Sequence, residues 1–199
     1  EELIATPCDD SMLARAETLT AELLRLGITK YNCYTADSGL PDTLTARLHS
    51  DPRPKVLLID QVAGDLSIPG ALASEEDFVA MVAAARRNHP DARLLLRTHP
   101  DTRLGKKSGV LARLALDDVE VVAEHCHPHA LLNSVEAVYT VSSQMGFEAL
   151  LLGKAVHCFG MPFYAGWGLT HDSKTCPRRQ GPIALPQLVA AALILYPRY

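Results

Sequence analysis

The sequence lacks a long apolar run, a secretion signal and any paired-cysteine motif. No uninterrupted apolar stretch approaches the roughly 20 residues of a membrane-spanning helix. The N-terminus EELIATPCDD has neither the basic start nor the apolar core of a signal peptide. The 5 cysteines are scattered without a CxxC spacing, which is typical of reduced thiols. We therefore expect a cytoplasmic protein without disulfides.

Positive charge and aromatic residues are scarce as well. Aromatic residues make up 6% of the 199 residues, and 19 Lys and Arg stand against 23 Asp and Glu, for a net charge of −4. A nucleic-acid groove needs a basic stripe with interleaved stacking rings, so we expect no nucleic acid as a partner. The absence of GxGxxG after the first expected strand argues against a dinucleotide oxidoreductase, and the absence of GxSxG argues against a serine esterase.

Short apolar segments alternate with helical segments along the chain. We expect strands at residues 55–60, 93–98, 119–123, 137–141 and 155–159. Helices are expected at 12–26 behind a Ser11 cap, from 74 to 88, around 109–116, from 128, at 144–152 and at 185–195, with a linker-like stretch at 171–182. This order predicts an α/β fold, with a Rossmann-like, doubly wound parallel sheet of about five or six strands.

Length and composition bound the domain organisation. With 48% hydrophobic residues, the chain can bury one full core. We expect residues 1–50 to form an N-terminal helix and a connecting segment. Residues 51–199 are expected to form a single compact unit that ends in a C-terminal helix.

Two serines stand between an expected strand and a helix start. Ser142 and Ser143 follow the strand at 137–141, and the helix begins at Gln144. Such a turn directs unpaired N–H groups and the positive end of the helix dipole at one spot, where an anion fits. Glu148 shares a helix face with Gln144 and can accept hydrogen bonds from a ribose diol. In the alternative interpretation, Ser143 is only an N-cap and Glu148 only a solvated helix residue.

Cationic residues gather at the end of the strand at 93–98. They are Arg97, His99, Arg103, Lys106 and Lys107, with Pro100 directly after the histidine. Because the whole chain carries net negative charge, this local concentration predicts a phosphate nearby.

The segment from Glu124 to His129, EHCHPH, contains potential metal ligands. Alternate side chains of an extended segment face opposite ways, and zinc-finger spacing is absent, so we expect no metal. A strand end and a helix cap are the expected roles of this segment.

Four motifs in order carry a family resemblance: DQVAGDLS, RTHPDTRLGKKSG, SSQMGFEALLLGK and PFYAGWGLT. Over residues 30–170 they resemble the capsule polysaccharide biosynthesis family of KpsC type, the retaining β-Kdo glycosyltransferases. The resemblance implies the nucleotide-binding half of the two-lobed glycosyltransferase B (GT-B) architecture, with CMP-Kdo as the donor substrate and no cofactor. It also implies a lipid-linked Kdo acceptor, and with it a position peripheral to the inner membrane.

The resemblance implies the residues of the reaction. The family's D-Q-x-x-x-D element falls on Asp60, Gln61 and Asp65, and Asp65 is implied as the nucleophile of a two-step retaining transfer. From composition alone, Asp65 reads as a turn or cap aspartate. His99 and Pro100 match the family's HP element, which is implied to hold the phosphate as it leaves.

The remaining motif matches imply residues that bind the donor substrate. Arg97, Lys106 and Lys107 are implied to assist His99, and Arg97 stands where the family usually has lysine. The resemblance implies that the CMP phosphate and ribose are bound by Ser142, Ser143 and the G-F-E-A-L element, which begins at Gly146 and contains Glu148. Tyr164, Gly166 and Trp167 match the aromatic loop beneath the donor, for which simple packing is an equally good interpretation.

No counterpart of the family's first lobe is found in the sequence. We therefore expect the chain to be a truncated donor-binding lobe, with the missing N-terminal lobe as its partner and little transfer activity alone. Two alternatives stay open: an epimerase-like lobe of similar fold that binds a nucleotide sugar, and a non-catalytic domain that binds phosphorylated ligands.

Overall fold

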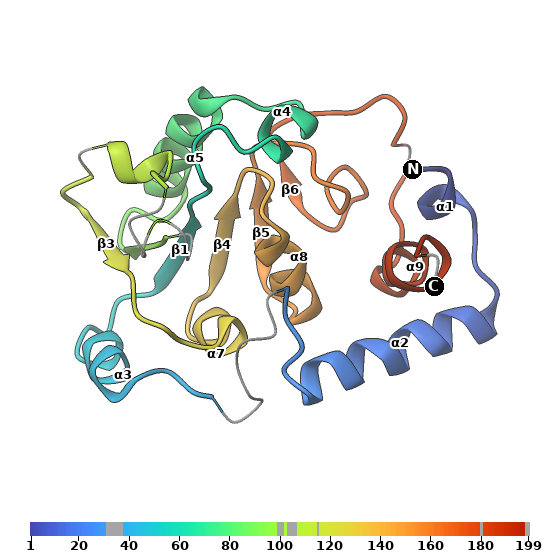
Figure 1. The fold of residues 1–199 in the computed structure, drawn as a ribbon, viewed down its shortest axis with the longest axis horizontal. Helices are drawn as coiled ribbons and strands as arrows, with labels where there is room; N and C mark the ends of the chain where they lie inside the picture. Colours follow the sequence, from blue (N-terminus) through green and yellow to red (C-terminus); the bar gives the residue numbers. More distant parts are fainter. Residues whose placement is uncertain (31–37, 99–101, 103–106, 115, 180, 198–199) are drawn as a thin grey trace.

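A parallel sheet forms the centre of the chain. The computed structural model describes residues 1–30, 38–98, 102, 107–114, 116–179 and 181–197. Its 6-stranded sheet has the order β3-β2-β1-β4-β5-β6, and every neighbouring pair is parallel (Figure 1). The strands are β1 (Lys55–Ile59), β2 (Arg93–Arg97), β3 (Val119–Val122), β4 (Ala137–Thr140), β5 (Ala155–Cys158) and β6 (His171–Asp172).

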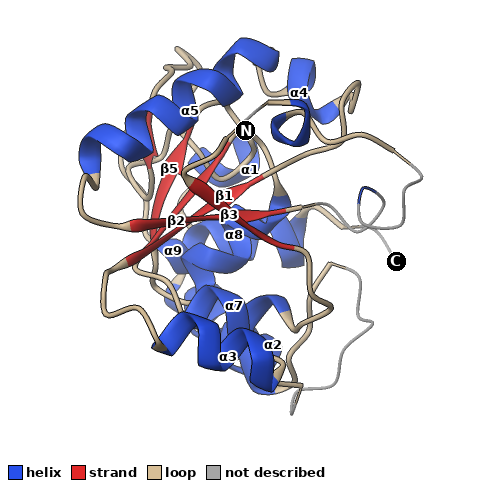
Figure 2. Ribbon diagram, turned by 90° about the vertical axis from the view of Figure 1, so that its left-hand side faces the viewer, coloured by secondary structure: helices blue, strands red, loops and turns tan. Residues whose placement is uncertain are grey.

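Helices cover both faces of this sheet. Figure 2 shows α4 (Ser67–Gly70) and α5 (Glu75–Asn88) above the sheet, with α3 (Asp42–His49), α7 (Pro128–Asn133) and α8 (Gln144–Leu151) below it. A short 3₁₀ segment, η1 (Leu111–Arg113), precedes β3. The described residues thus form the doubly wound α/β arrangement that the strand–helix alternation predicts.

The two ends of the chain meet beside the sheet. Helices α1 (Glu2–Ala5) and α2 (Asp10–Arg25) contact α9 (Leu185–Val189) and its π-helical continuation η2 (Ala190–Leu195), on the right of Figure 1. The expected helix at 185–195 is therefore confirmed. The division of the chain at residue 50 stays a prediction.

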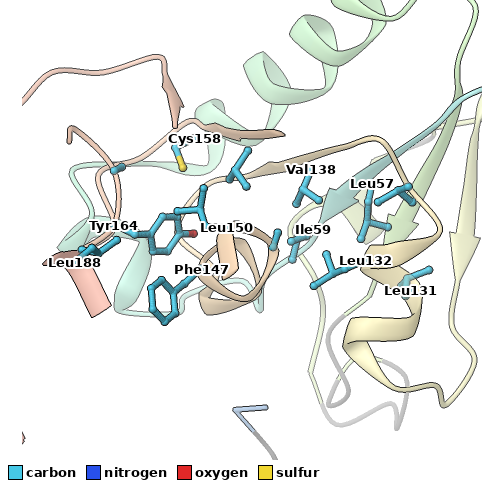
Figure 3. Close-up of a cluster of buried hydrophobic side chains, with 14 of the residues drawn as sticks. Leu57, Ile59, Leu131, Leu132, Val138, Phe147, Leu150, Cys158, Tyr164 and Leu188 are labelled. Atoms are coloured by element: carbon cyan, nitrogen blue, oxygen red, sulfur yellow. The ribbon is translucent and has the colours of Figure 1, made fainter. Parts of the chain in front are cut away.

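Side chains of the central strands alternate between two apolar cores, as the period of a strand dictates. Val56 and Leu58 of β1 pack in the cluster that contains α5. Leu57 and Ile59 pack on the other face, in the cluster that contains α7 and α8 (Figure 3). Burial on both faces explains why the strands read as continuous apolar runs in the sequence.

The structure corrects several details of the expected elements. Among the described residues, the helix expected around 109–116 is reduced to η1, and α3 lies in the stretch that was expected to be a connecting segment. The side chain of Asp9, not Ser11, caps α2, because its Oδ1 accepts a hydrogen bond from the N–H of Met12 at 2.8 Å. Strand β6, His171–Asp172, lies within the stretch that we expected to be a linker. A strand of two residues carries no periodicity, so the sequence offers no signal for it.

Candidate functional site

A cavity opens where the loops after β1 and β4 meet. These strands are neighbours at the centre of the sheet, yet the chain runs from β1 to one edge and from β4 to the other. Ligands of open α/β sheets bind at such a switch point, outside the carboxyl ends of the strands. The cavity measures about 270 Å³, and it is lined by these predicted site residues: Gln61, Asp65, Arg97, Ser142, Ser143, Gln144, Glu148 and Tyr164.

Gln61 clamps the two central loops together. Its Nε2 donates to Ser142 Oγ at 2.9 Å and to Ser67 Oγ at 3.2 Å. Its Oε1 accepts from the backbone N–H of Ser142 at 2.9 Å. The buried amide therefore fixes the loop after β1 against the serine turn after β4.

The serine turn ends in a capped helix. Ser143 Oγ accepts from the N–H of Met145 at 3.3 Å, and Ser143 N–H donates to Thr140 Oγ1 at 3.1 Å. Ser143 is thus an N-cap, as the alternative interpretation holds, but it also lines the cavity. Ser143, Gln144 and Met145 line the cavity, so the N-terminus of α8, which is the positive end of its dipole, lies at the cavity wall.

Tyr164 supports the serine turn from the apolar core. Its side chain is fully buried within the apolar cluster (Figure 3). Its Oη donates to the carbonyl oxygen of Ser143. A Cβ at Gly146 would lie 2.3 Å from that Oη, so the first turn of α8 can sit over the phenol only because residue 146 is glycine. Gly146 therefore permits the close packing of α8 against Tyr164.

The rest of the aromatic loop lies outside the cavity. Trp167 is fully buried, and its Nε1 donates to the carbonyl oxygen of Phe163 at 2.9 Å. Gly166 N–H donates to Asp172 Oδ2 at 2.8 Å. Neither residue lines the cavity, so the packing interpretation fits Gly166 and Trp167, whereas Phe163 and Tyr164 reach the cavity wall.

Asp65 stands in the loop between β1 and α4. Its Oδ1 accepts from the N–H of Ser67 at 2.8 Å, which is the turn arrangement that composition alone predicts. The residue is half-buried and lines the cavity, as the residues of the serine turn do. A carboxylate held by a turn at the wall of a cavity is suitably placed to act on a bound ligand.

Glu148 is buried, which contradicts the interpretation as a solvated helix residue. Glu148 is only 6% exposed, and its Oε1 accepts a hydrogen bond from the backbone N–H of Lys30 at 3.0 Å. Burial raises the pKa of the Glu148 carboxyl above its ordinary value, although the hydrogen bond from Lys30 opposes this effect. A buried acceptor that faces a cavity favours a ligand that brings hydroxyl donors.

Asp60 joins the loops after β1 and β2. Its carboxylate accepts from the N–H groups of Gln61 at 2.9 Å, Leu111 at 2.9 Å and Ala112 at 3.2 Å. Burial raises the pKa of Asp60, and these N–H groups oppose the rise. The carboxylate therefore anchors η1, and with it the end of the loop after β2, to the end of β1.

The cationic cluster is described only in part. Arg97 lines the cavity, and its Nη1 donates to the carbonyl oxygen of Glu124 at 2.7 Å. Lys107 is exposed and is not a lining residue. The implied roles of His99, Pro100 and Lys106 fall on positions outside the described residues.

Several lining residues carried no signal in the sequence. Thr29 and Lys30 reach the cavity from the segment after α2, and Pro128 from the start of α7. Tertiary folding brings these positions to the cavity, and no motif marks them. Ser67, at the start of α4, and Phe163 also line the cavity; they lie within the DQVAGDLS and PFYAGWGLT motifs, although no role was expected of them.

Potential metal ligands in the described part of the chain do not cluster. No group of three or more His, Cys, Asp or Glu side chains there is arranged to hold a metal ion. His127 is instead the N-cap of α7, and its side chain accepts from His129 N–H, which confirms the expected helix cap. Within the same described ranges, no helix is both long and apolar enough to cross a membrane.

The sheet order and the cavity at its switch point define a Rossmann-like α/β protein. A family model described as "Capsule polysaccharide biosynthesis protein" matches residues 10–199. This chain belongs to the capsule polysaccharide biosynthesis protein family.

Curated relatives are longer than this chain. The capsule polysaccharide modification protein LipA of Neisseria meningitidis serogroup B is 39% identical over 204 residues, which cover 99% of this chain and 28% of LipA. The lipopolysaccharide-processing protein LpsZ of Rhizobium meliloti is 36% identical over 190 residues, which cover 95% of this chain and 42% of LpsZ.

Solved structures of Kdo transferases share the fold. The Thermosulfurimonas dismutans KpsC β-Kdo 2,4 transferase is 43% identical and superposes with a TM-score of 0.86, over 97% of this chain and 58% of that one. The β-Kdo 2,7 transferase of the same KpsC is 30% identical with a TM-score of 0.66, over 98% of this chain and 56% of that one.

Proposed function

We propose that this chain is the donor-binding lobe of a retaining β-Kdo glycosyltransferase, which transfers Kdo from CMP-β-Kdo to a lipid-linked acceptor in the synthesis of the capsule linker. The proposal rests mainly on one observation: Asp65, the serine turn and Glu148 open onto a single cavity at the switch point of the sheet. The likeness to the β-Kdo 2,4 transferase supports it further.

Each part of the donor has a chemical counterpart in the cavity. The phosphate of CMP lies at the N-terminus of α8, between the hydroxyls of Ser142 and Ser143, where hydrogen bonds and the helix dipole stabilise its charge. The ribose diol donates to Glu148. His99, assisted by Arg97, neutralises the phosphate as the bond to the sugar breaks.

Asp65 is the nucleophile in this proposal. Its carboxylate attacks the anomeric carbon, the bond from that carbon to the phosphate oxygen breaks, and CMP leaves with the electron pair. An acceptor hydroxyl then attacks the same carbon, loses its proton and releases Asp65. Two inversions at one carbon give net retention.

The acceptor side of the reaction lies in the remainder of a longer protein. The curated relatives extend well beyond the matched region. In the GT-B arrangement, a second lobe binds the Kdo-bearing lipid acceptor and closes over the donor, at the cytoplasmic surface of the inner membrane. No metal is needed, because the helix N-terminus and the cationic residues supply the positive charge.

Nucleotide selectivity tests the binding part of the proposal. We expect CMP at 100 times its Kd to stabilise the chain by about 2.7 kcal/mol in a thermal-shift assay, with a smaller effect of UMP. Glu148→Ala should lose most of this effect. A preference for UDP would instead support the epimerase-like alternative, and indifference to the base would support a general phosphate-binding domain.

Covalent trapping tests the chemical part. Incubation with CMP-Kdo of a protein that contains this lobe and its acceptor-binding lobe should give an adduct of one Kdo residue on Asp65, detected by intact-mass and peptide mass spectrometry. Asp65→Asn should abolish the adduct and retain CMP binding. Asp91→Asn, in an exposed turn, is the matched control. An adduct that persists in Asp65→Asn would contradict the assignment.

A further inference from the structure

His127 occupies a defined tautomer in the interior of the protein. The residue is 2% exposed and caps the start of α7. Its Nδ1 accepts a hydrogen bond from the backbone N–H of His129 at 3.0 Å. A backbone N–H can only donate, so the neutral imidazole carries its proton on Nε2. That Nε2 lies 3.1 Å from the carbonyl oxygen of Gly27, to which it donates.

Gly27 ends α2 in a conformation that sets the direction of the following segment. Its φ is +63°, and its N–H donates to Leu24 O at 3.2 Å, while Ile28 N–H donates to Leu23 O at 2.9 Å. This is a Schellman arrangement, in which glycine takes the left-handed position at the helix end. The hydrogen bond from His127 holds the carbonyl of this same residue.

The segment that His127 holds leads directly into the cavity. Thr29 and Lys30 line the cavity, and the N–H of Lys30 donates to Glu148 Oε1 at 3.0 Å. This contact joins residues 118 positions apart, so its geometry depends on the tertiary contacts that position the segment after α2. A continuous path of hydrogen bonds and backbone therefore runs from the start of α7, through Gly27, to the Glu148 carboxylate.

We propose that His127 is a positioning residue for ribose recognition: it holds Gly27, and through it Lys30, so that the Glu148 carboxylate faces the sugar of a bound nucleotide. The inference rests on the proposed nucleotide site. It gives the histidine of the EHCHPH segment a function other than metal binding, and it links the end of the N-terminal helix α2 to the cavity.

Ribose discrimination is the readout, because a merely structural effect would weaken all nucleotides alike. We measure Kd by calorimetry for CMP and for 2′,3′-dideoxy-CMP, which lacks both ribose hydroxyls. The wild-type chain should bind CMP about tenfold more tightly than the dideoxy form, the effect expected of a hydrogen bond to a carboxylate. His127→Ala should lose this ratio and leave the affinity for dideoxy-CMP almost unchanged.

Two further variants separate positioning from folding. His127→Gln retains a donor and an acceptor, so it should recover much of the ratio. His129→Ala removes an equally buried ring from the same helix start but leaves the bond to Gly27, so it should retain the ratio. A ratio that survives in His127→Ala, or that is lost equally in His129→Ala, would overturn the inference.

A measurement without ligand tests whether His127 positions the backbone of Lys30. The amide of Lys30 should lose protection from hydrogen exchange about tenfold in His127→Ala and not in His129→Ala. Unchanged protection in His127→Ala contradicts the inference even if CMP binds as proposed. If the wild type binds no CMP while Lys30 protection falls as expected, the proposed nucleotide site fails, and the ribose role fails with it.

Discussion

The cavity and the histidine stack on the α5 face of the sheet both contain polar side chains with shifted pKa values, but they differ in what surrounds these side chains. In the stack, the ring of His157 lies 4.2 Å from that of Tyr139 and 4.5 Å from that of His171, centroid to centroid. Burial, followed by the nearby charges of His171 and His89, lowers the pKa of His157 to about 4. None of these rings lines the cavity.

Burial shifts pKa values in both regions, so the two regions differ in geometry and not in the cause of the shift. The stack arises from residues at the same level of three adjacent strands, because Tyr139, His157 and His171 are register partners. The stacked rings pack against one another, and none of them lines the cavity. The cavity arises from loops that leave different strands and converge. A shifted pKa alone therefore reports burial, whereas convergence of loops around a cavity indicates a site.

The largest expected effect is at the Gln61 clamp. Gln61→Glu keeps the shape but cannot donate to Ser142 and Ser67, and it adds a negative charge where the phosphate should bind. We expect CMP affinity to fall by at least 100-fold, about 2.7 kcal/mol, in calorimetry. Gln187→Glu is the matched control. The amide of Gln187 donates to the carbonyl oxygen of Ile4, neither residue lines the cavity, and the variant should leave CMP affinity unchanged. Equal losses in both variants would contradict the role of the clamp.

The next effect concerns the packing beneath the serine turn. Gly146→Ala places a Cβ 2.3 Å from Tyr164 Oη and 2.9 Å from Thr140 Cγ2. Such overpacking should lower the free energy of unfolding by about 2 kcal/mol in urea titrations. Gly70→Ala in α4 adds a Cβ with no atom within 4 Å and should change stability little. If Gly146→Ala is as stable as Gly70→Ala, the close approach does not constrain the turn.

The smallest effect belongs to the histidine stack. The pKa of His157 is lower in the folded protein, about 4, than its ordinary value of 6.5, so the unfolded chain binds the extra proton between these pH values. Stability should therefore fall as the pH is lowered from 6.5 to 4. The His157 contribution should be about 1 kcal/mol, after allowance for partial solvent screening. His157→Phe should flatten this part of the urea-stability profile without changing CMP affinity at pH 7. An unchanged slope, or weaker CMP binding, would contradict the separation of the two regions.

Local patterns in the sequence predicted much of the fold. The strands at 55–60, 93–98, 119–123, 137–141 and 155–159 are confirmed to within one residue at their ends. The buried central strands β1 and β4 are short apolar runs bounded by polar turns, whereas β3 and β5 are partly exposed. The rule that parallel strands end at a common edge then accounts for the meeting of Asp65 with Ser142 and Ser143 in the cavity.

Other features depend on tertiary contacts that no local pattern encodes. Thr29 and Lys30 follow a helix end without a motif, and tertiary folding brings them to the cavity, where the N–H of Lys30 donates to Glu148. Tyr164 and Trp167 share one aromatic motif and are equally buried, yet only Tyr164 lines the cavity. The roles of the lining residues in binding and catalysis stay predictions.

The central claim is that the serine turn after β4 binds the phosphate of a cytidine nucleotide. Titration of the ¹⁵N-labelled chain with CMP, followed by amide NMR shifts, tests it most directly. We predict the largest shifts at Ser142, Ser143 and Gln144, smaller shifts at Lys30, and none at His157 or His171. Shifts centred on the histidine stack, or no shift at the serine turn under saturating CMP, would contradict the claim.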